Sequence, residues 1–345
     1  MNNLILGAYA AAPPGLESDT QAENRWYSLL RDSQNIGGLE LPFYATLHSR
    51  GVKRLASLLD QQWSCVVTTI PGTVQRMKEN PAYGLASDNS PGREAAVGDL
   101  HRAYEQIREL RAIAGPTSVQ AIQILSAPSQ PKASSSVLSF TRSLTEIASW
   151  DWEGVRLTVE HCDAAREDTE PQKGFLSLAG EIEAAQEAGR ESGRQIGHTI
   201  NWARSAIELR DIEAPAAHLA LLNARQVLTG LMFSGVSAIA TNHGEAWADM
   251  HLPVDTGGQP SSLLSAEQIR TCTGLAGTAS YVGVKVAADP RKCAVQEQRL
   301  APALATVAEV VSALQPPATP VKMTDEESPG NRQRLERTPY KQTHP

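Results

Sequence analysis

Short apolar runs alternate along the chain with longer segments that have the apolar period of a helix. Strands that alternate with helices in this way form parallel βαβ units, because each crossover helix covers a face of the sheet. Eight such units predict a closed (β/α)8 barrel, the TIM-barrel fold class. The expected strands are at 3–9, 37–42, 64–70, 119–126, 155–160, 196–201, 229–234 and 281–286.

Capping signals mark where several of the helices begin and end. Thr20 followed by Glu23 predicts a capping box, in which each side chain satisfies a backbone N–H of the first turn. Proline is favoured in a first turn, and glycine or proline is favoured just beyond a last turn. Signals of these kinds place further helix ends at Ser90-Pro91, at Gly115, at Ser265 with Gln268, and at Pro316.

The expected links differ in length between the two ends of the barrel. Links from a helix to the next strand are short, whereas the links at 71–89, 161–176 and 235–264 are long and all follow strands. In a barrel these long links lie at the C-terminal mouth of the strands, where active sites form. Tolerated insertions would give the same asymmetry, so it does not by itself identify an enzyme.

Residues 316–345 differ in composition from the barrel, which is expected to span residues 1–315. The segment begins with a proline-rich stretch and continues with mixed charges, and few of its side chains are apolar. It cannot bury enough apolar surface to offset the entropy that is lost on folding. We therefore expect a disordered C-terminal tail.

Charge and composition narrow the classes of partner. The formal net charge of -7 disfavours a nucleic-acid partner, whose phosphates require a dense Lys and Arg surface. No apolar stretch approaches the roughly 20 residues that span a bilayer, and the N-terminus lacks the basic residues of a signal peptide, so no membrane partner is expected. The four cysteines form no CxxC pair and suit free thiols in the cytoplasm. The sequence leaves a homodimer open.

Polar side chains that end buried parallel strands point into the barrel mouth, where enzymes of this fold carry their active sites. Most of the expected strands have such a side chain at or just after their last residue. These residues are the candidates for binding a small-molecule substrate or for catalysis. They are Glu40, Gln123, Glu160, His161, Asp163, Asn201, Trp202, Arg204, Ser234 and Lys285.

Glu160 is the preferred general base among them. It ends an apolar strand, and burial there would raise its pKa toward the value that a base needs. The alternative is an ion-paired residue at the rim of the barrel. His161 and Asp163 follow Glu160 closely, and for these two both substrate binding and capping of the next loop stay open.

Lys285 lies within an apolar strand and is the second expected catalytic residue. A buried ammonium needs a partner, so we expect Lys285 to pair with Glu40, with Glu160 or with an anionic group of the substrate. The end of strand eight is a frequent anion site in barrels, which favours the substrate contact. An internal ion pair that only stabilises the barrel is the alternative.

Two segments combine aromatic and polar side chains. Asn201, Trp202 and Arg204 suit sugar hydroxyls, an apolar sugar face and an anion, and the alternative is helix capping with Trp202 packed below. Residues 242–251 lack the HExxH spacing of a zinc motif and are expected to form a lid with Trp247 as an aromatic wall. Nucleotide-binding and serine-hydrolase motifs are absent, and no cofactor is predicted.

Motifs on most of the expected strands resemble a known family. They are Asn-Leu-Ile-Leu-Gly-Ala-Tyr, Gly-Gly-Leu-Glu-Leu-Pro, Val-Glu-His-Cys-Asp with Gln-Lys-Gly-Phe-Leu after it, Ile-Asn-Trp-Ala-Arg-Ser-Ala-Ile-Glu and Val-Gly-Val-Lys-Val. Over roughly residues 2–290 the sequence resembles an uncharacterised bacterial family that is grouped with the xylose-isomerase-like TIM barrels, the sugar phosphate isomerase/epimerase superfamily. The resemblance implies a barrel whose relatives move a proton at a sugar carbon.

The resemblance also implies a divalent metal, which relatives often hold through carboxylates and histidines on strands five to eight. Glu160 and Glu40 match acidic positions on strands five and two. Asn201, Ser234 and Lys285 stand where Asp, His and Glu are common, and a lysine would repel a divalent ion. We therefore expect a metal-free or strongly altered site. If a metal is bound, the expected ligands are Glu160, His161, Asp163 and His243.

Three hypotheses for function follow. The first is an isomerase or epimerase that transfers a proton at a carbon of an anionic sugar, with Glu160 as the base. Lys285 or Arg204 would then hold the anion or an enediolate, and Trp202 or Trp247 would stack on the sugar ring. The second is a lyase or aldolase that uses Lys285 as a Schiff-base nucleophile. The third is a barrel that binds a carbohydrate without converting it.

Overall fold

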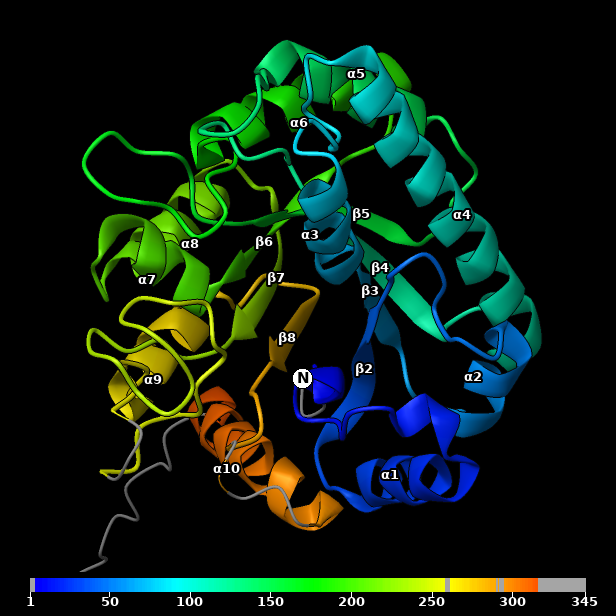
Figure 1. Cartoon of the computed structure of the whole chain (residues 1–345), viewed down its shortest axis with the longest axis vertical. Helices are drawn as coiled ribbons and strands as arrows, with labels where there is room; N and C mark the ends of the chain where they lie inside the picture. The colour runs from blue at the N-terminus through cyan, green and yellow to red at the C-terminus, as the bar shows by residue number, and fades with distance from the viewer. Residues whose placement is uncertain (1–3, 258–260, 290, 292–294, 316–345) are drawn as a thin grey trace, which may run out of the picture. The chain divides into compact units, whose positions relative to one another are not determined.

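The computed structural model describes residues 4–257, 261–289, 291 and 295–315. In this part of the chain, eight parallel strands pair in sequence order, and β8 closes the barrel against β1 (Figure 1). The expected (β/α)8 fold is confirmed. The strands are β1 Leu4–Leu6, β2 Ile36–Pro42, β3 Cys65–Thr68, β4 Val119–Ile124, β5 Arg156–His161, β6 Gly197–Asn201, β7 Leu228–Phe233 and β8 Tyr281–Val284.

Helices surround the barrel as an outer ring (Figure 1). Two short 3-10 helices, Ala8–Ala10 and Leu16–Ser18, lie between β1 and the first α-helix. The α-helices are α1 Thr20–Asp32, α2 Val52–Leu58, α3 Ile70–Glu79, α4 Ser90–Ala114, α5 Val137–Ala148, α6 Leu178–Ser192, α7 Trp202–Leu209, α8 Ala214–Ala224, α9 Ala266–Leu275 and α10 Gln296–Leu314.

One of the three long links contains a helix that the sequence analysis missed. The link at 71–89 was expected to be a loop, but α3 occupies its first half, with Pro71 in its first turn. Proline suits this position because the first turn leaves its N–H groups unpaired in any case. Arg76 and Lys78 lie in the last turn, where cations interact favourably with the helix dipole.

The capping predictions are confirmed at some positions and wrong at one. Asp19, not Thr20, is the N-cap of α1, and its Oδ1 accepts hydrogen bonds from the backbone of residues 21 and 22. Ser265 caps α9 as expected, but the Gln268 side chain donates to Glu213 and leaves the capping box half formed. The predicted ends of α4, Ser90 and Gly115, are confirmed.

Alternation of side chains along the strands divides the barrel into two apolar regions. One set of residues faces the helices and forms the main core. The other set faces the interior, where a smaller cluster contains Ile5, Val66, Ala121, Met232 and Tyr281. Successive residues of a strand point to opposite faces, so Glu40, Glu160 and Lys285 project inward and nearer the C-terminal ends of their strands.

Some sequence predictions concern residues beyond the barrel strands. Cys65, Cys162 and Cys272 are buried free thiols, as expected, whereas Cys293 lies outside the described residues. The predicted tail at 316–345 also lies outside them. Within the described ranges, no helix has both the length and the apolar character needed to cross a bilayer.

Candidate active site at the barrel mouth

Two carboxylates and two cations from different elements of the fold meet in the barrel interior. Lys285 Nζ, just after β8, lies 3.0 Å from Glu40 Oε2 of β2 and 4.0 Å from Glu160 Oε1 of β5. On the other side of Glu160, the same Oε1 lies 2.7 Å from a terminal nitrogen of Arg204 in α7. All four side chains are at most 1% exposed, so each buried charge is balanced by an opposite one.

The row of alternating charges continues toward the surface through a long loop. Asp249 Oδ2 lies 3.1 Å from Arg204 Nε, and it accepts a hydrogen bond of 3.1 Å from Lys173 Nζ. Asp249 lies in the segment expected to form a lid, and Lys173 lies in the loop after β5. The two longest helix-free βα loops of the barrel therefore contact each other through this carboxylate.

The charges act differently on the two interior carboxyl groups. Burial raises the pKa of Glu40 above its ordinary value, and Lys285 offsets only part of that effect. Burial would also raise the pKa of Glu160, but the charges of Arg204 and Lys285 outweigh it and hold that pKa below its ordinary value. For Lys285, burial would lower the pKa, but Glu40 and the neighbouring groups raise it well above the usual range. The site therefore holds an ionised Glu160, a protonated Lys285 and a carboxyl group at Glu40 that gains a proton readily.

The interior carboxylates have few hydrogen bonds within the described residues: neither oxygen of Glu40 has one, although Oε2 pairs with the Lys285 ammonium, and Oε2 of Glu160 has none. Glu40 Oε1 and Glu160 Oε2 have no partner among the residues that the structure describes. Asn201 donates weakly to the other oxygen of Glu160 at 3.5 Å, and Ser234 Oγ donates to the Asn201 oxygen at 3.0 Å. Asn201 and Ser234 therefore orient Glu160, whereas the free oxygens are open to a ligand.

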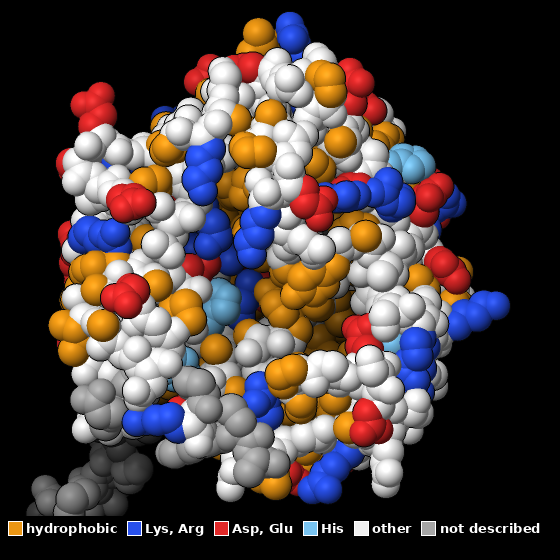
Figure 2. Space-filling view, in the orientation of Figure 1, with side chains coloured by type: hydrophobic (Ala, Val, Ile, Leu, Met, Phe, Trp, Pro, Cys, Tyr) orange, Lys and Arg blue, Asp and Glu red, His pale blue; other side chains and the backbone are white. Residues whose placement is uncertain are grey.

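A cavity of about 470 Å³ reaches Glu40 from the surface. Figure 2 shows a hollow on the same face, with hydrophobic side chains lining it and basic side chains gathered beside it. Walls of aromatic and aliphatic side chains with a few polar groups are typical of small-molecule sites. The lining includes Tyr9, Trp26, Leu39, Glu40, Tyr44 and Leu47.

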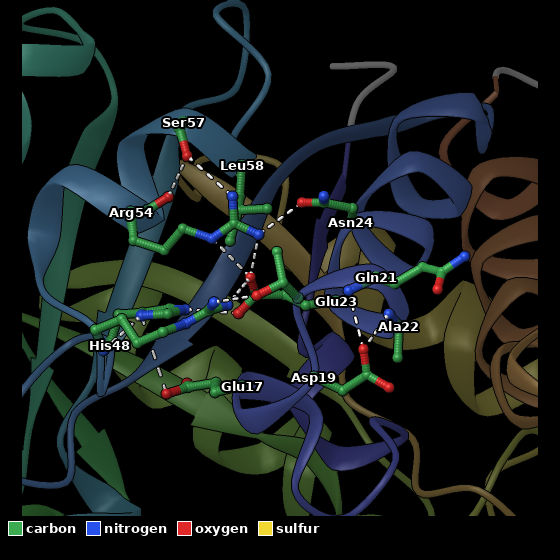
Figure 3. A network of polar contacts seen from close by, with 12 residues as sticks. Glu17, Asp19, Gln21, Ala22, Glu23, Asn24, His48, Arg54, Ser57 and Leu58 are labelled. Carbon is green, nitrogen blue, oxygen red and sulfur yellow. Dashed lines mark hydrogen bonds and ion pairs between the residues drawn. The ribbon is translucent and has the colours of Figure 1, made fainter.

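Glu23 in α1 holds the segment after β2, which forms part of the cavity wall. Its carboxylate is fully buried and accepts a 2.9 Å hydrogen bond from His48 Nε2 and further bonds from Arg50 and Arg54 (Figure 3). The neighbouring Glu17 accepts from the Ser49 backbone at 2.7 Å. The loop after β2, which carries part of the cavity wall, is therefore held against α1 by ionic contacts.

Gly7 permits the close approach of Glu40 and Lys285. A Cβ atom at this position would lie 2.9 Å from Glu40 Oε2 and 3.0 Å from Lys285 Cβ. Its φ of −75° is open to any residue, so the requirement for glycine is steric and does not come from the backbone. The sequence analysis did not select Gly7, because a lone glycine after a strand has no distinguishing pattern.

His161 and Asp163 lie on the other side of the strand from Glu160. His161 faces the helices, where Nδ1 lies 2.7 Å from Glu181 and Nε2 lies 2.7 Å from Glu208. Burial would lower the pKa of His161, but these two carboxylates raise it to about 10. Asp163 accepts a hydrogen bond from the Lys173 backbone at 2.8 Å, so the loop-capping alternative describes its contact.

Three other predicted binding residues have different surroundings. Trp202 is fully buried in the main core, so the packing alternative applies and ring stacking does not. Trp247 is half-buried, with the Arg210 guanidinium 5.2 Å from its ring centroid. Gln123 lies deeper in the barrel than Glu40, where it donates to the Tyr281 hydroxyl at 3.1 Å.

The conditional metal set of the sequence analysis does not come together. Glu160 faces the interior and is occupied by Arg204, whereas His161 faces the helices and His243 interacts with Asp289 and Arg291. The family resemblance implies a divalent metal inside the mouth, but Lys285 lies there between Glu40 and Glu160. A divalent ion at this place would be repelled by the ammonium, so the residues present do not fit it.

Sequence comparison places the chain in a family. The model of the family described as "Domain of unknown function (DUF4862)" matches residues 5–301. The chain belongs to this family. It is also similar to an uncharacterized protein, STM3670, of Salmonella typhimurium strain LT2. The two are 34% identical over 268 aligned residues, which make up 77% of this chain and 83% of that protein.

Solved structures show where the DUF4862 barrel belongs among folds. It is similar to a putative xylose isomerase from Rhodospirillum rubrum, with a TM-score of 0.58, 12% identity and coverage of 92% of this chain and 100% of that chain. It is also similar to L-ribulose 3-epimerase, with a TM-score of 0.55, 13% identity and coverage of 91% and 95%. At these identities the likeness establishes a xylose-isomerase-like fold, as the sequence resemblance predicted.

Proposed function

We propose that this protein is a sugar isomerase or epimerase that moves a proton at a carbon next to a carbonyl group. Glu40 acts as the acid and base of this transfer. One observation carries the proposal: Glu40 is the buried carboxyl group that lines the cavity, and its Oε1 has no hydrogen-bond partner within the described residues. Burial raises its pKa above the ordinary value, which makes Glu40 a stronger base than an exposed carboxylate.

Lys285 supplies the positive charge that the reaction needs. When the Glu40 carboxylate removes the proton, the electron pair of the C–H bond moves onto the carbonyl oxygen and forms an enediolate. Glu40 becomes neutral as it takes the proton, and the protonated Lys285, 3.0 Å from Glu40, then stabilises the negative charge that has moved to the oxyanion. Return of the proton to the neighbouring carbon, while the proton of the substrate hydroxyl passes to the enediolate oxygen, gives isomerisation. Epimerisation requires that the enediolate turn its other face to Glu40 before the proton returns to the same carbon.

This assignment revises the sequence hypothesis that Glu160 is the base. Arg204 and Lys285 hold the pKa of Glu160 low, and a weakly basic carboxylate removes a carbon-bound proton poorly. Glu160 serves instead as the fixed negative charge that positions the two cations. Its free Oε2 leaves it able to accept a hydrogen bond from a substrate hydroxyl.

The cavity supports a sugar-type substrate with an anionic group. Aromatic and aliphatic walls suit the apolar face of a sugar, and the carboxylates at the inner end suit its hydroxyls. Basic side chains gather beside the hollow in Figure 2.

The Schiff-base hypothesis has weaker support. A lysine nucleophile must lose its proton, and the contacts of Lys285 raise its pKa well above the usual range. In the structure, Glu40 lies 3.0 Å from the Lys285 ammonium and favours its protonated form. A cytoplasmic location remains part of the proposal, and the buried free thiols of Cys65, Cys162 and Cys272 support it.

The test is exchange of a carbon-bound hydrogen with solvent. The full chain is incubated in D2O with a panel of aldoses, ketoses and their phosphates, and each recovered sugar is analysed for deuterium next to the carbonyl group. Glu40→Gln should abolish the exchange and keep binding. Glu17→Gln is the matched control, because Glu17 lines the same cavity but is 44% exposed and lies outside the charge row. Saturable binding without exchange across the panel would instead indicate a carbohydrate-binding barrel without activity.

A further inference from the structure

A second cluster of potential ligands lies outside the barrel interior. His161 at the end of β5, Glu208 in α7 and His218 in α8 place one ligand atom each within 4.8 Å of one another. In the described ranges this is the one group of three or more His, Cys, Asp or Glu residues with such spacing. It faces the helices, on the opposite side of β5 from Glu160.

Hydrogen bonds to both histidines orient the donors of this cluster. His161 Nδ1 lies 2.7 Å from Glu181, whose other oxygen accepts a hydrogen bond from Ser126, and Nε2 then points at Glu208. A carboxylate behind a histidine ligand is a frequent second partner in metal sites, because it fixes the ring and increases its basicity. His218 is held in the same manner, with Nδ1 3.0 Å from the Ser205 hydroxyl.

The charges around His161 do not balance. Two carboxylates, Glu181 and Glu208, contact one imidazole, which contributes at most one positive charge. Glu181 and His161 are fully buried and Glu208 is 10% exposed, so water screens this excess negative charge poorly. A divalent cation at the cluster would remove the excess.

We propose that His161, Glu208 and His218 bind a divalent transition metal, with Zn²⁺ as the preferred ion. Two imidazoles and one carboxylate are a donor set that zinc favours, and three protein ligands leave a position for water. The ion replaces the proton between His161 Nε2 and Glu208. Zinc bonds of about 2.0–2.1 Å place donors roughly 3.4 Å apart. The 2.7 Å contact of His161 with Glu208 therefore widens, and the partly exposed His218 moves inward from its place within 4.8 Å of both.

The bound metal joins β5 to α7 and α8 at the base of the loop that carries Lys173. Glu208 already accepts a 3.2 Å hydrogen bond from the backbone of Ala164, the start of that loop. Metal binding therefore stabilises the fold and fixes one side of the mouth. The site is separate from the proposed proton transfer, which requires no metal.

The experiment uses the full chain after chelator treatment. Isothermal titration with Zn²⁺ should show one site per chain, and thermal unfolding should occur at a higher temperature with the ion than without it. His218→Ala and Glu208→Gln should each weaken binding more than about 100-fold, and Ser205→Ala should weaken it about 10-fold. Circular dichroism of each variant checks that the fold is intact.

The control pair is His101 and Glu105 on the exposed face of α4, which are of the same residue types and lie 3.8 Å apart. His101→Ala and Glu105→Gln should leave zinc binding unchanged. Absence of a stoichiometric site in the parent protein would overturn the proposal. Equal binding by the parent, His218→Ala and Glu208→Gln would do the same, because it would show adventitious surface binding.

Discussion

The ammonium of Lys285 lies between two carboxylates, 3.0 Å from Glu40 and 4.0 Å from Glu160. Glu40 lies on β2, Glu160 lies on β5 and Lys285 follows β8, so the lysine links these three strands through charge. Lys285 lies closer to Glu40 than to Glu160. The cation nearest to Glu160 is Arg204, at 2.7 Å. The pKa of Glu40 is raised and that of Glu160 is lowered, and this difference is the basis on which we propose Glu40 as the group that exchanges a proton.

Replacement of this lysine should destabilise the barrel strongly. Lys285→Met leaves the Glu40 carboxylate buried without its cation, which costs about 3–5 kcal/mol of unfolding free energy. In the double variant with Glu40→Gln the loss should be clearly smaller than the sum of the two single losses, because the uncompensated charge is gone. Urea unfolding of all four proteins measures the coupling. Simple additivity would show that the two side chains do not form a pair.

Gly7→Ala tests the close packing around the same pair. The added methyl group overlaps Glu40 Oε2 and the Lys285 stem, so stability should fall by about 1–3 kcal/mol and sugar turnover should fall with it. Gly98→Ala in α4 is the control, since nothing lies within 4 Å of its Cβ position, and it should raise stability by about 0.5–1 kcal/mol. An unaffected Gly7→Ala protein would mean that the pair is not packed against this glycine.

Glu23 should stabilise the cavity wall in a pH-dependent manner. Burial would raise its pKa, but Arg50, His48 and Arg54 outweigh burial and lower it below the ordinary value. The stabilisation is therefore fully present above the unfolded pKa and is lost as pH falls through the folded one. Glu23→Gln should cost about 2 kcal/mol at neutral pH, and the difference from the parent should narrow below about pH 4. A difference that stays constant with pH would contradict an ionised Glu23.

Trp202 should matter for stability and not for sugar binding. Its side chain is fully buried in the main core, so Trp202→Phe creates a cavity and costs about 2 kcal/mol. The affinity for any sugar found in the exchange panel should be unchanged. Trp247→Phe, at a half-buried position, should cost less stability. Weaker sugar binding by Trp202→Phe at unchanged stability would restore its predicted stacking role.

The sequence predicted the parts of the site that strand geometry determines. Glu40, Glu160 and Lys285 lie on apolar strands of a predicted barrel, and alternation along a strand then directs them inward. Asp249 and Lys173 lie in long loops, where no period shows which way a side chain points. The protonation behaviour of Glu160 could not be predicted either, because it depends on an arginine from another element.

Both residues of the capping box predicted at the start of α1 have other roles, one for a local reason and the other because of long-range contacts. Asp19 and Thr20 are both good N-cap residues, and the choice between them depends on where the preceding turn places the chain. Glu23 was assigned to a capping box, but three partners from the loop after β2 and from α2 bind its carboxylate. These long-range contacts outweigh the local capping preference, and the sequence spacing contains no sign of them.

The most direct test of the account compares Glu40→Gln with Glu160→Gln in the deuterium-exchange experiment. Both variants replace a buried interior carboxylate by the isosteric amide. Any general effect of losing a buried charge is therefore the same in both variants. The account predicts that Glu40→Gln abolishes incorporation of deuterium next to the carbonyl group, whereas Glu160→Gln slows it and leaves it measurable. Loss of incorporation in Glu160→Gln with retention in Glu40→Gln would contradict the account and return the role of base to Glu160.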